Sequence, residues 1–204
     1  MHDFDKAYWE NHWARATGHT PGRELPVNPY LPAETQHLPV GTALDAGCGA
    51  GVEAVWLAQH GWQVTGADIS APALAAATSR TEQAGLAGQV EWVEADLTRW
   101  EPGRTWDLVV TNYAHPTIGQ LAFYQRLASW VVPGGSMLIV GHLHAPHAGG
   151  DHPVEATVTR SGITGLFTGP GWQVDASYEN TRTVDAGGRT VQLHDVIVRA
   201  HRRP

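Results

Sequence analysis

This chain of 204 residues has little of what several protein classes require. Lys6 is the single lysine among 13 basic residues, and the formal net charge is −7. The basic pair Arg202 and Arg203 is too short to form the positive surface of a nucleic-acid-binding protein. The low number of basic residues therefore predicts no nucleic-acid partner. A single cysteine, Cys48, excludes an internal disulfide.

Long apolar runs are missing as well. No stretch approaches the roughly 20 apolar residues that a membrane-spanning helix needs, and the run 136–141 is typical. Residues 1–5 are acidic and lack the regions of a signal peptide. We therefore expect no membrane partner and a cytoplasmic location. The length predicts a single domain over residues 1–204 with a sizeable core, and the oligomeric state stays open.

What the chain does contain is a glycine-rich loop between an apolar run and a helical pattern. The loop falls in residues 44–51 (LDAGCGAG), and apolar residues at helical spacing follow it. Its glycines allow the backbone to approach a ligand closely, because they have no Cβ atom. The N-terminus of the following helix adds N–H groups and a positive dipole end. Such a loop can bind a nucleotide-like ligand or a carboxylate.

The glycine spacing and a nearby acid separate two ligand classes. A dinucleotide-binding loop follows G-x-G-x-x-G, whereas this loop follows G-x-G-x-G, and Val52 stands where the last glycine is needed. Asp45 would repel a pyrophosphate and attract a ligand that carries an ammonium group. These two residues disfavour a nicotinamide-dependent oxidoreductase, which remains the second alternative.

The run from Asp45 to Gly51 resembles the first motif of the class I methyltransferases, which use S-adenosylmethionine. The resemblance implies that Gly47, Cys48 and Gly49 bind the amino-acid end of this cofactor, with the acid acting nearby.

Two tryptophans near the N-terminus extend this resemblance. Trp9 and Trp13 are four residues apart in a predicted helix over residues 3–16, so they share a face. With the glycine-containing loop that follows, they resemble the N-terminus of the thiopurine and tellurite-resistance methyltransferases. That face closes the cofactor pocket as a lid, or it packs against the edge of the sheet.

Acids and apolar residues follow the next two predicted strands. Asp68 ends the strand 62–68, at the spacing from the glycine loop where an acid binds two ribose hydroxyls. Ile69 beside it is placed to pack on adenine. The resemblance implies that Asp96 and Leu97, which follow the strand 89–95, contact the adenine amino group and ring. A turn-forming role is the alternative for the second acid.

Candidate catalytic residues follow the strands predicted over 106–111 and 136–140. Asn112 and Tyr113 lie at the carboxyl end of the first, where open α/β sheets bind ligands. His115 and His142 are the candidate bases, because histidine titrates in the useful range. A base is optional here, since a methyl sulfonium is already activated. The alternative for each histidine is a hydrogen bond to a loop carbonyl.

A histidine cluster raises the question of a metal site. His142, His144, His147 and His152 lie within eleven residues. The first three partly resemble the H-x-H-x-D-H run of metallo-hydrolases, but Pro146 replaces the required aspartate. Alternating histidines on an extended segment also point to opposite sides. We therefore predict no metal.

The resemblance implies an α/β, Rossmann-like, doubly wound fold. Its sheet is mostly parallel and seven-stranded, with a C-terminal antiparallel hairpin and an N-terminal lid helix. The single methyltransferase domain divides into lid and cap helices (1–40), a cofactor-binding core (41–142), a substrate-side loop (143–170) and the hairpin (171–204).

Finer features are predicted from local patterns. A helix over 117–131 carries Ile118, Leu121, Ala122 and Ala128 on one stripe. A sharp turn is expected at 133–135 and a short helical piece over 154–166. The hairpin strands are expected at 172–182 and 189–200, joined by Gly187 and Gly188.

The predicted function is S-adenosylmethionine-dependent methyl transfer, by in-line displacement, to a sulfur, oxygen or nitrogen atom of a small molecule. The acceptor is expected between the N-terminal helix and the loops 112–116 and 141–153. The alternative is a protein that binds S-adenosylmethionine without methyl transfer, either cyclase-like or cofactor-sensing.

Overall fold

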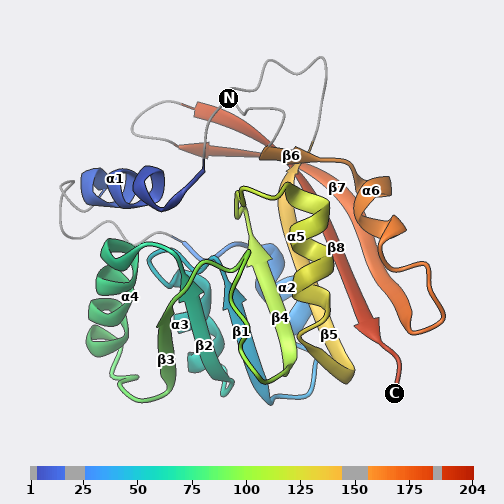
Figure 1. The fold of residues 1–204 in the computed structure, drawn as a ribbon, viewed down its shortest axis with the longest axis horizontal. Coiled ribbons are helices and arrows are strands. Elements are labelled where there is room, and N and C mark those ends of the chain that lie inside the picture. Colours follow the sequence, from blue (N-terminus) through green and yellow to red (C-terminus); the bar gives the residue numbers. More distant parts are fainter. Residues whose placement is uncertain (1–3, 17–25, 144–155, 186–189) are drawn as a thin grey trace.

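A mixed sheet forms the centre of the molecule (Figure 1). The computed structural model describes residues 4–16, 26–143, 156–185 and 190–204. Within them, seven strands follow the order β3-β2-β1-β4-β5-β8-β7, and β6 pairs with β5. The strands are β1 (Thr42–Ala46), β2 (Gln63–Asp68), β3 (Val90–Glu94), β4 (Trp106–Asn112), β5 (Val131–Leu143), β6 (Thr157–Val158), β7 (Trp172–Asp185) and β8 (Thr190–Arg202). The helices are α1 (Lys6–Ala16), α2 (Tyr30–Thr35), α3 (Val52–Gln59), α4 (Ala71–Gln83), α5 (Gln120–Ala128) and α6 (Arg160–Gly165).

The strand directions confirm the predicted fold class. The first five strands pair in parallel, whereas β8 runs antiparallel to β5 and to β7. The two-residue strand β6 adds an eighth member to the predicted seven. It occupies part of the segment where a helix was expected, so that prediction was wrong at its start. Thr159 begins α6 instead, because its side chain accepts a hydrogen bond from the Gly162 N–H at 3.1 Å.

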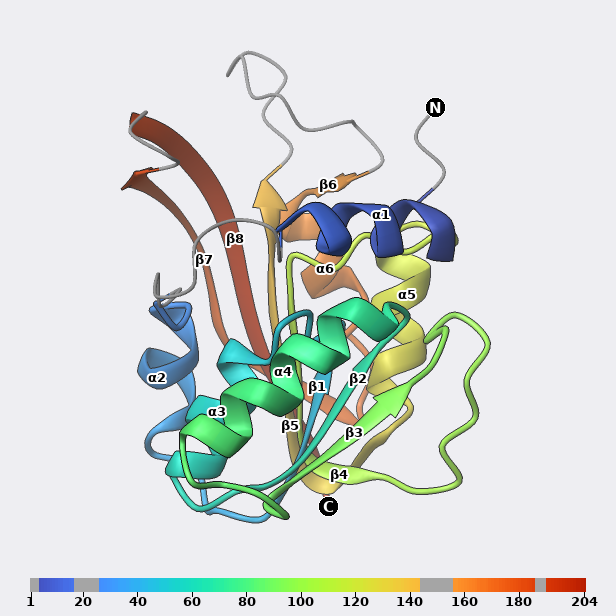
Figure 2. The ribbon, with the colours of Figure 1, turned by 90° about the vertical axis from the view of Figure 1, so that its left-hand side faces the viewer.

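Helices cover both faces of this sheet. In Figures 1 and 2, α5 and α6 lie on one face, and α2 and α3 lie on the other, with α4 beside α3. Each face has its own core, because successive strand residues point to opposite sides. Val109 belongs to one core and Val110 to the other. Burial on both faces explains the continuous apolar run of β4.

The predicted stripe of α5 was wrong. Ile118 and Leu121 are 44% and 38% exposed, while Phe123, Tyr124 and Leu127 are buried. The helix begins at Gln120 and not at residue 117, so the residues before it are not part of the helical face. Two large aromatic side chains and a leucine three or four residues apart determine which face packs on the sheet.

The sharp turn expected at 133–135 is an irregularity within a strand. Val131 pairs with Trp106 and Ser136 pairs with Leu108, and the register shifts between these two pairs. The three residues of the predicted turn therefore belong to a bulge-like irregularity within β5, where they have no paired partner in β4. The two glycines of the predicted hairpin turn lie outside the described residues.

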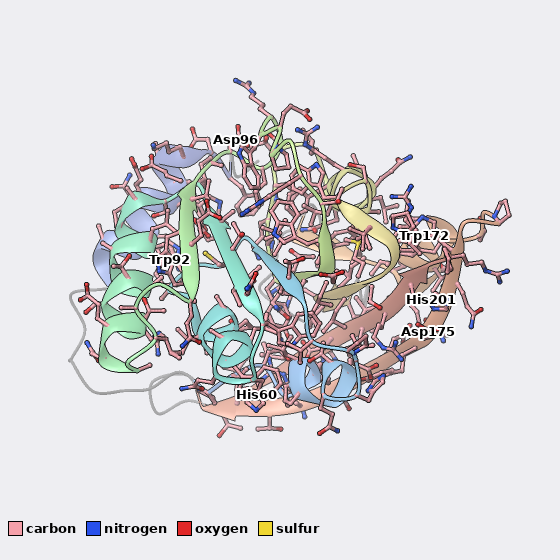
Figure 3. All side chains as sticks on the ribbon, turned by 90° about the horizontal axis from the view of Figure 1, so that it is seen from below. His60, Trp92, Asp96, Trp172, Asp175 and His201 are labelled. Carbon is pink, nitrogen blue, oxygen red and sulfur yellow. The ribbon has the colours of Figure 1, made fainter. Side chains whose placement is uncertain are left out.

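Different residues lie at the two ends of the strands. At the carboxyl ends of β1, β2 and β4 the chain forms loops beneath α1 (Figures 1 and 2). The opposite edge, seen in Figure 3, carries Asp175 and His201, whose side chains are 2.9 Å apart. Arg199 forms ion pairs with Asp175 (3.0 Å) and with Glu34 of α2 (3.2 Å), which connect the hairpin to α2.

No helix of the described chain is long and apolar enough to span a bilayer.

Candidate functional site

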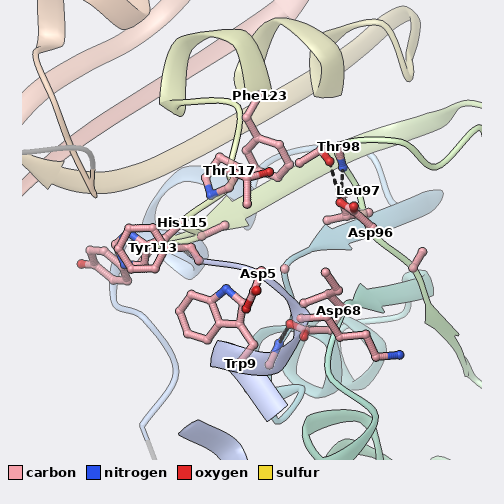
Figure 4. Close-up of a pocket in the computed structure, with 18 of the residues that line it drawn as sticks. Asp5, Trp9, Asp68, Asp96, Leu97, Thr98, Tyr113, His115, Thr117 and Phe123 are labelled. Carbon is pink, nitrogen blue, oxygen red and sulfur yellow. Dashed lines mark hydrogen bonds between the residues drawn. The ribbon is translucent and has the colours of Figure 1, made fainter. Parts of the chain in front are cut away.

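A cavity of about 440 Å³ lies where the carboxyl ends of the parallel strands meet α1. This volume is typical of a small-molecule site. Most of the predicted site residues line it: Trp9, Trp13, Gly47, Gly49, Asp68, Ile69, Asp96, Leu97, Asn112, Tyr113 and His115. Figure 4 shows Asp68 and Asp96 on one side of the cavity and Tyr113 and His115 on the other, with Trp9 extending between them.

Three predicted site residues do not line this cavity. Asp45 is 1% exposed and lies beneath the glycine loop, so the three strand-end acids do not share one rim. Cys48 is buried, and burial raises the pKa of its thiol well above the ordinary value. His142 is 9% exposed and lies behind His115, with the two rings 5.5 Å apart. The other three histidines of the cluster fall outside the described residues.

Several lining residues were not predicted. They are Phe4, Asp5, Lys6, Ala95, Thr98, Arg99, Ala114, Pro116, Thr117 and Phe123. Most are chain neighbours of predicted residues, so a wider window around each strand end would have included them. Phe123 was missed because the predicted stripe of α5 pointed in another direction.

Close approach explains the first two glycines of the loop. Gly47 and Gly49 have φ of 80° and 50°, which favour glycine. A Cβ atom on Gly49 would stand 2.6 Å from the ring of Trp13, and one on Gly47 would stand 2.9 Å from the Cβ of Ala114. The glycine loop is therefore approached from α1 on one side and from the 112–116 loop on the other.

Asp68 connects the glycine loop to the start of α4. Its Oδ2 atom accepts a hydrogen bond from the Gly49 N–H at 2.8 Å, and its Oδ1 atom accepts one from the Ser70 N–H at 2.9 Å. Ser70 caps α4, since its hydroxyl accepts a hydrogen bond from the Ala73 N–H at 3.3 Å. Each carboxylate oxygen has further acceptor capacity for a ligand hydroxyl. Burial raises the pKa of Asp68.

Asp96 lines the cavity and also closes a turn. It lines the cavity, and its Oδ1 atom also accepts hydrogen bonds from the N–H (3.0 Å) and hydroxyl (2.6 Å) of Thr98, as drawn in Figure 4. Its Oδ2 atom lies 3.8 Å from the guanidinium of Arg99. The turn that Asp96 closes holds the adjacent Leu97 against the cavity.

A second acid, Glu53, lies half-buried near Asp45 and was not predicted. Asp45 accepts a hydrogen bond from the Ala54 N–H, and its Oδ2 atom has no hydrogen-bond partner among the described residues. Glu53 accepts a bond from the Asn28 N–H at 3.1 Å. Burial raises the pKa of both acids, and for Asp45 repulsion from Glu53 and Asp68 adds to this. Negative charge below the glycine loop favours a cationic ligand above it.

Asn112 lines the cavity and carries a buried amide donor. Its Oδ1 atom accepts a hydrogen bond from the side chain of Asn28 at 3.3 Å. Its Nδ2 atom is buried without a hydrogen-bond partner among the described residues. An amide donor and a carboxylate at one site suit a ligand that carries both a carboxylate and an ammonium group.

Replacing Asp45 with asparagine should stabilise the ligand-free protein and weaken binding of the cofactor that the sequence predicts. A carboxyl whose pKa is raised by folding favours the folded state at low pH, and this contribution is lost as pH rises through the raised pKa. At neutral pH the neutral amide should therefore raise the melting temperature by a few degrees, since about 1 kcal/mol corresponds to roughly 2–4 °C at this size. Affinity for S-adenosylhomocysteine, the demethylated cofactor, should fall about tenfold.

Calorimetric titration across a pH series measures both effects for Asp45→Asn. Wild-type affinity should weaken as pH falls through the raised pKa, because protonation removes the charge that attracts the ligand ammonium. The variant should show a flatter pH dependence. Equal affinity and equal pH dependence in the two proteins would exclude an electrostatic role for Asp45.

The loop after β4 begins with a strained residue. Tyr113 has a φ of 52°, which costs a non-glycine residue roughly 1–2 kcal/mol. Its N–H donates to the Val140 carbonyl at 2.9 Å, its hydroxyl accepts a bond from Arg182 at 2.9 Å, and its ring stacks on His142 at 4.5 Å. Burial raises the pKa of Tyr113, so its hydroxyl stays neutral.

Stacked rings continue from this loop to α1. His115 lies between His142, 5.5 Å away, and Trp9, 6.0 Å away, with interplanar angles of 12° and 9°. Phe4 also stacks on His115, with centroids 5.2 Å apart. Of the two candidate bases, His115 lines the cavity and His142 does not. The cavity is thus polar near the glycine loop and aromatic near His115.

Comparisons with known proteins show which family the chain resembles. A family model described as a methyltransferase domain matches residues 43–135. A probable thiol methyltransferase 2 from Arabidopsis thaliana is 32% identical over 157 residues, covering 74% of this chain and 68% of the relative. A ribosomal RNA small subunit methyltransferase C from Alcanivorax borkumensis is 39% identical over 113 residues, covering 52% of this chain and 34% of the relative. The chain therefore matches about one third of the length of the second protein.

A solved structure shows the same fold. The N-methyltransferase NodS from Bradyrhizobium japonicum, in complex with S-adenosylhomocysteine, superposes with a TM-score of 0.70 at 16% identity. The superposition covers 96% of this chain and 98% of NodS.

Proposed function

This chain belongs to the class I S-adenosylmethionine-dependent methyltransferases, related to the thiol methyltransferases, and we propose that it methylates the sulfur of a small thiol. The enzyme class and the cofactor predicted from the sequence are confirmed by the family match. The acceptor, its attacking atom and the roles of individual residues belong to the proposal.

The cavity residues fit the cofactor group by group. Asp68 would accept the two ribose hydroxyls, and Asp96 with Leu97 would hold adenine. The glycine loop, Asn112 and the buried charge of Asp45 would hold the amino-acid end. The Asn112 Nδ2 donor and the Asp45 Oδ2 acceptor, both without hydrogen-bond partners among the described residues, support this placement. S-adenosylmethionine supplies an activated methyl group when bound.

One observation carries the choice of a small acceptor. The cavity has a volume of about 440 Å³, and α1 contributes Trp9 and Trp13 to its wall. The acceptor must share this volume with the cofactor. The protein would orient the acceptor toward the methyl group and exclude water, and such positioning can contribute about 7–11 kcal/mol to catalysis.

Sulfur is favoured over oxygen as the attacking atom because the candidate base on the cavity is flanked by other aromatic rings. His115, the candidate base on the cavity, lies stacked between other rings. A thiol with a pKa of about 8.5 ionises near neutral pH with little help, whereas an alcohol needs a base. The named thiol methyltransferase relative supports the same choice.

Formation of S-adenosylhomocysteine with matched acceptors tests the proposal. Thiophenol, phenol and aniline share one ring and differ in the attacking atom, and hydrosulfide tests the smallest thiol. We expect turnover with the two sulfur compounds, rising with pH as the thiolate fraction increases, and turnover at least tenfold slower with phenol and aniline. Equal rates for thiophenol and phenol would contradict a sulfur preference.

Two alternatives make different predictions in the same assay. A binding protein without methyl transfer would bind S-adenosylhomocysteine and form none with any acceptor. A macromolecular acceptor, as in the ribosomal RNA methyltransferase relative, would require turnover with ribosomal RNA but with no small molecule. The single-domain organisation and the cytoplasmic location stay predictions.

A further inference from the structure

We propose that Arg182, on the C-terminal hairpin, is a positioning residue for the loop that contacts the cofactor. This inference rests on the proposed cofactor site and not on the identity of the acceptor. Arg182 lies in β7 and does not line the cavity, so it acts through Tyr113, which does line the cavity.

The guanidinium of Arg182 makes two directed contacts. Its Nη2 atom donates to the Tyr113 hydroxyl at 2.9 Å, and its Nε atom donates to Asp195 Oδ2 at 2.7 Å. Asp195 is on β8, is fully buried, and also accepts a bond from the Tyr30 hydroxyl at 2.9 Å. The guanidinium carbon lies 5.9 Å and 6.0 Å from the ring centres of Tyr113 and Tyr30. A fixed carboxylate thus orients the arginine that holds Tyr113.

The held tyrosine determines where the next residue lies. Tyr113 has a φ of 52°, a backbone conformation that persists where surrounding contacts hold it. This conformation brings Ala114 against Gly47, where a Cβ on the glycine would be 2.9 Å from the alanine Cβ. Gln120 of α5 holds the same residue through the Ala114 carbonyl at 2.9 Å. Contacts therefore connect Arg182, Tyr113, Ala114 and the glycine loop.

Arginine geometry is essential to this arrangement. A guanidinium presents several N–H donors in a rigid plane, so it can bind a carboxylate and a phenol at once. A lysine at position 182 would retain the charge beside Asp195 but present one flexible ammonium group. Arg182→Lys should therefore preserve the pairing of the buried acid and lose the hold on Tyr113. Tyr113→Phe removes the same contact from the other side and leaves Arg182 and Asp195 paired.

Titration of the full chain with S-adenosylhomocysteine tests the proposal. We expect Arg182→Lys and Tyr113→Phe each to raise Kd about tenfold with melting temperatures near that of the wild type. Both substitutions remove the same hydrogen bond between Arg182 and Tyr113. The Kd of the double variant should therefore be no higher than the higher Kd of the two single variants. Arg160→Gln is the matched control, since Arg160 forms an exposed ion pair with Glu179 at 3.4 Å, and it should leave Kd unchanged.

The outcomes separate positioning from stability. If both single variants melt normally and bind as the wild type does, or if their effects on binding add, the proposal is wrong. If Arg182→Lys fails to fold, Tyr113→Phe decides, because it leaves the ion pair in place. S-adenosylhomocysteine binding needs no acceptor, so failure of the thiol assay leaves this result interpretable.

Discussion

Asp68→Ala is expected to weaken S-adenosylhomocysteine binding by about a hundredfold or more while the domain stays folded. The carboxylate holds the N–H groups of Gly49 and Ser70 and faces the cavity. The variant loses the proposed acceptor for the ribose hydroxyls and the bond that shapes the glycine loop. Hydrogen bonds to a charged group contribute about 1.5–3 kcal/mol each, and 2.7 kcal/mol corresponds to a factor of about 100 in Kd.

Stability should change little in Asp68→Ala, because the lost hydrogen bonds are offset by removal of a carboxylate that burial disfavours. That carboxylate has a raised pKa, which shows that folding penalises its charge. Calorimetric titration gives Kd, and thermal melting shows that the variant is folded.

Asp107→Ala is the matched control for this experiment. Asp107 also accepts two hydrogen bonds, from the N–H of Thr42 at 2.8 Å and from its hydroxyl at 2.7 Å. It lies outside the cavity, and these hydrogen bonds lower its pKa. The control should lose stability and keep its affinity. Wild-type affinity in folded Asp68→Ala would remove Asp68 from the site.

The order of the acids along the sheet explains why only two of three reach the cavity. Asp45 pairs with Gly66, which is two residues before Asp68, and Asp68 pairs with Glu94, which is two residues before Asp96. Each acid is therefore about 6–7 Å further along the strand direction than the one before it. Local patterns predicted the strand ends, but strand register determines depth, and register is not visible in one segment.

A non-local pairing also explains the misplacement of His142. The local pattern ended the strand near residue 140, which placed this histidine in a loop facing the ligand. In the structure β5 continues to Leu143 because β8 pairs with it, with His142 opposite Asp195. The partner strand lies some fifty residues later in the chain, so the pattern around His142 contains no sign of it.

The glycines of the loop were all expected to make room for a ligand, but one of them makes room for a side chain. Gly47 and Gly49 line the cavity, whereas Gly51 does not. A Cβ on Gly51 would stand 2.5 Å from the ring of Trp92, and one on Gly66 would stand 2.2 Å from the same ring. Trp92, labelled in Figure 3, comes from β3 and lies opposite Gly66 in the sheet. The third glycine of the motif therefore accommodates a side chain and not the ligand.

Gly66→Ala should lower the free energy of unfolding by about 1–3 kcal/mol, because the methyl group would overlap the indole ring. The ring cannot move aside freely, since its Nε1 atom donates to the Thr81 hydroxyl at 3.3 Å. Urea unfolding measures the change. Gly169→Ala, with no atom within 4 Å of the new Cβ, should be neutral or slightly stabilising.

Combining Gly66→Ala with Trp92→Ala identifies the ring as the cause. Trp92→Ala alone is destabilising, but it also empties the space that the new methyl group needs. The loss in the double variant should therefore be smaller than the sum of the two single losses. Additive losses would mean that overlap with the Trp92 ring is not the cause of the destabilisation. A coupled loss would show that the new methyl group and the Trp92 ring compete for the same space, which a Cβ on Gly51 would also enter.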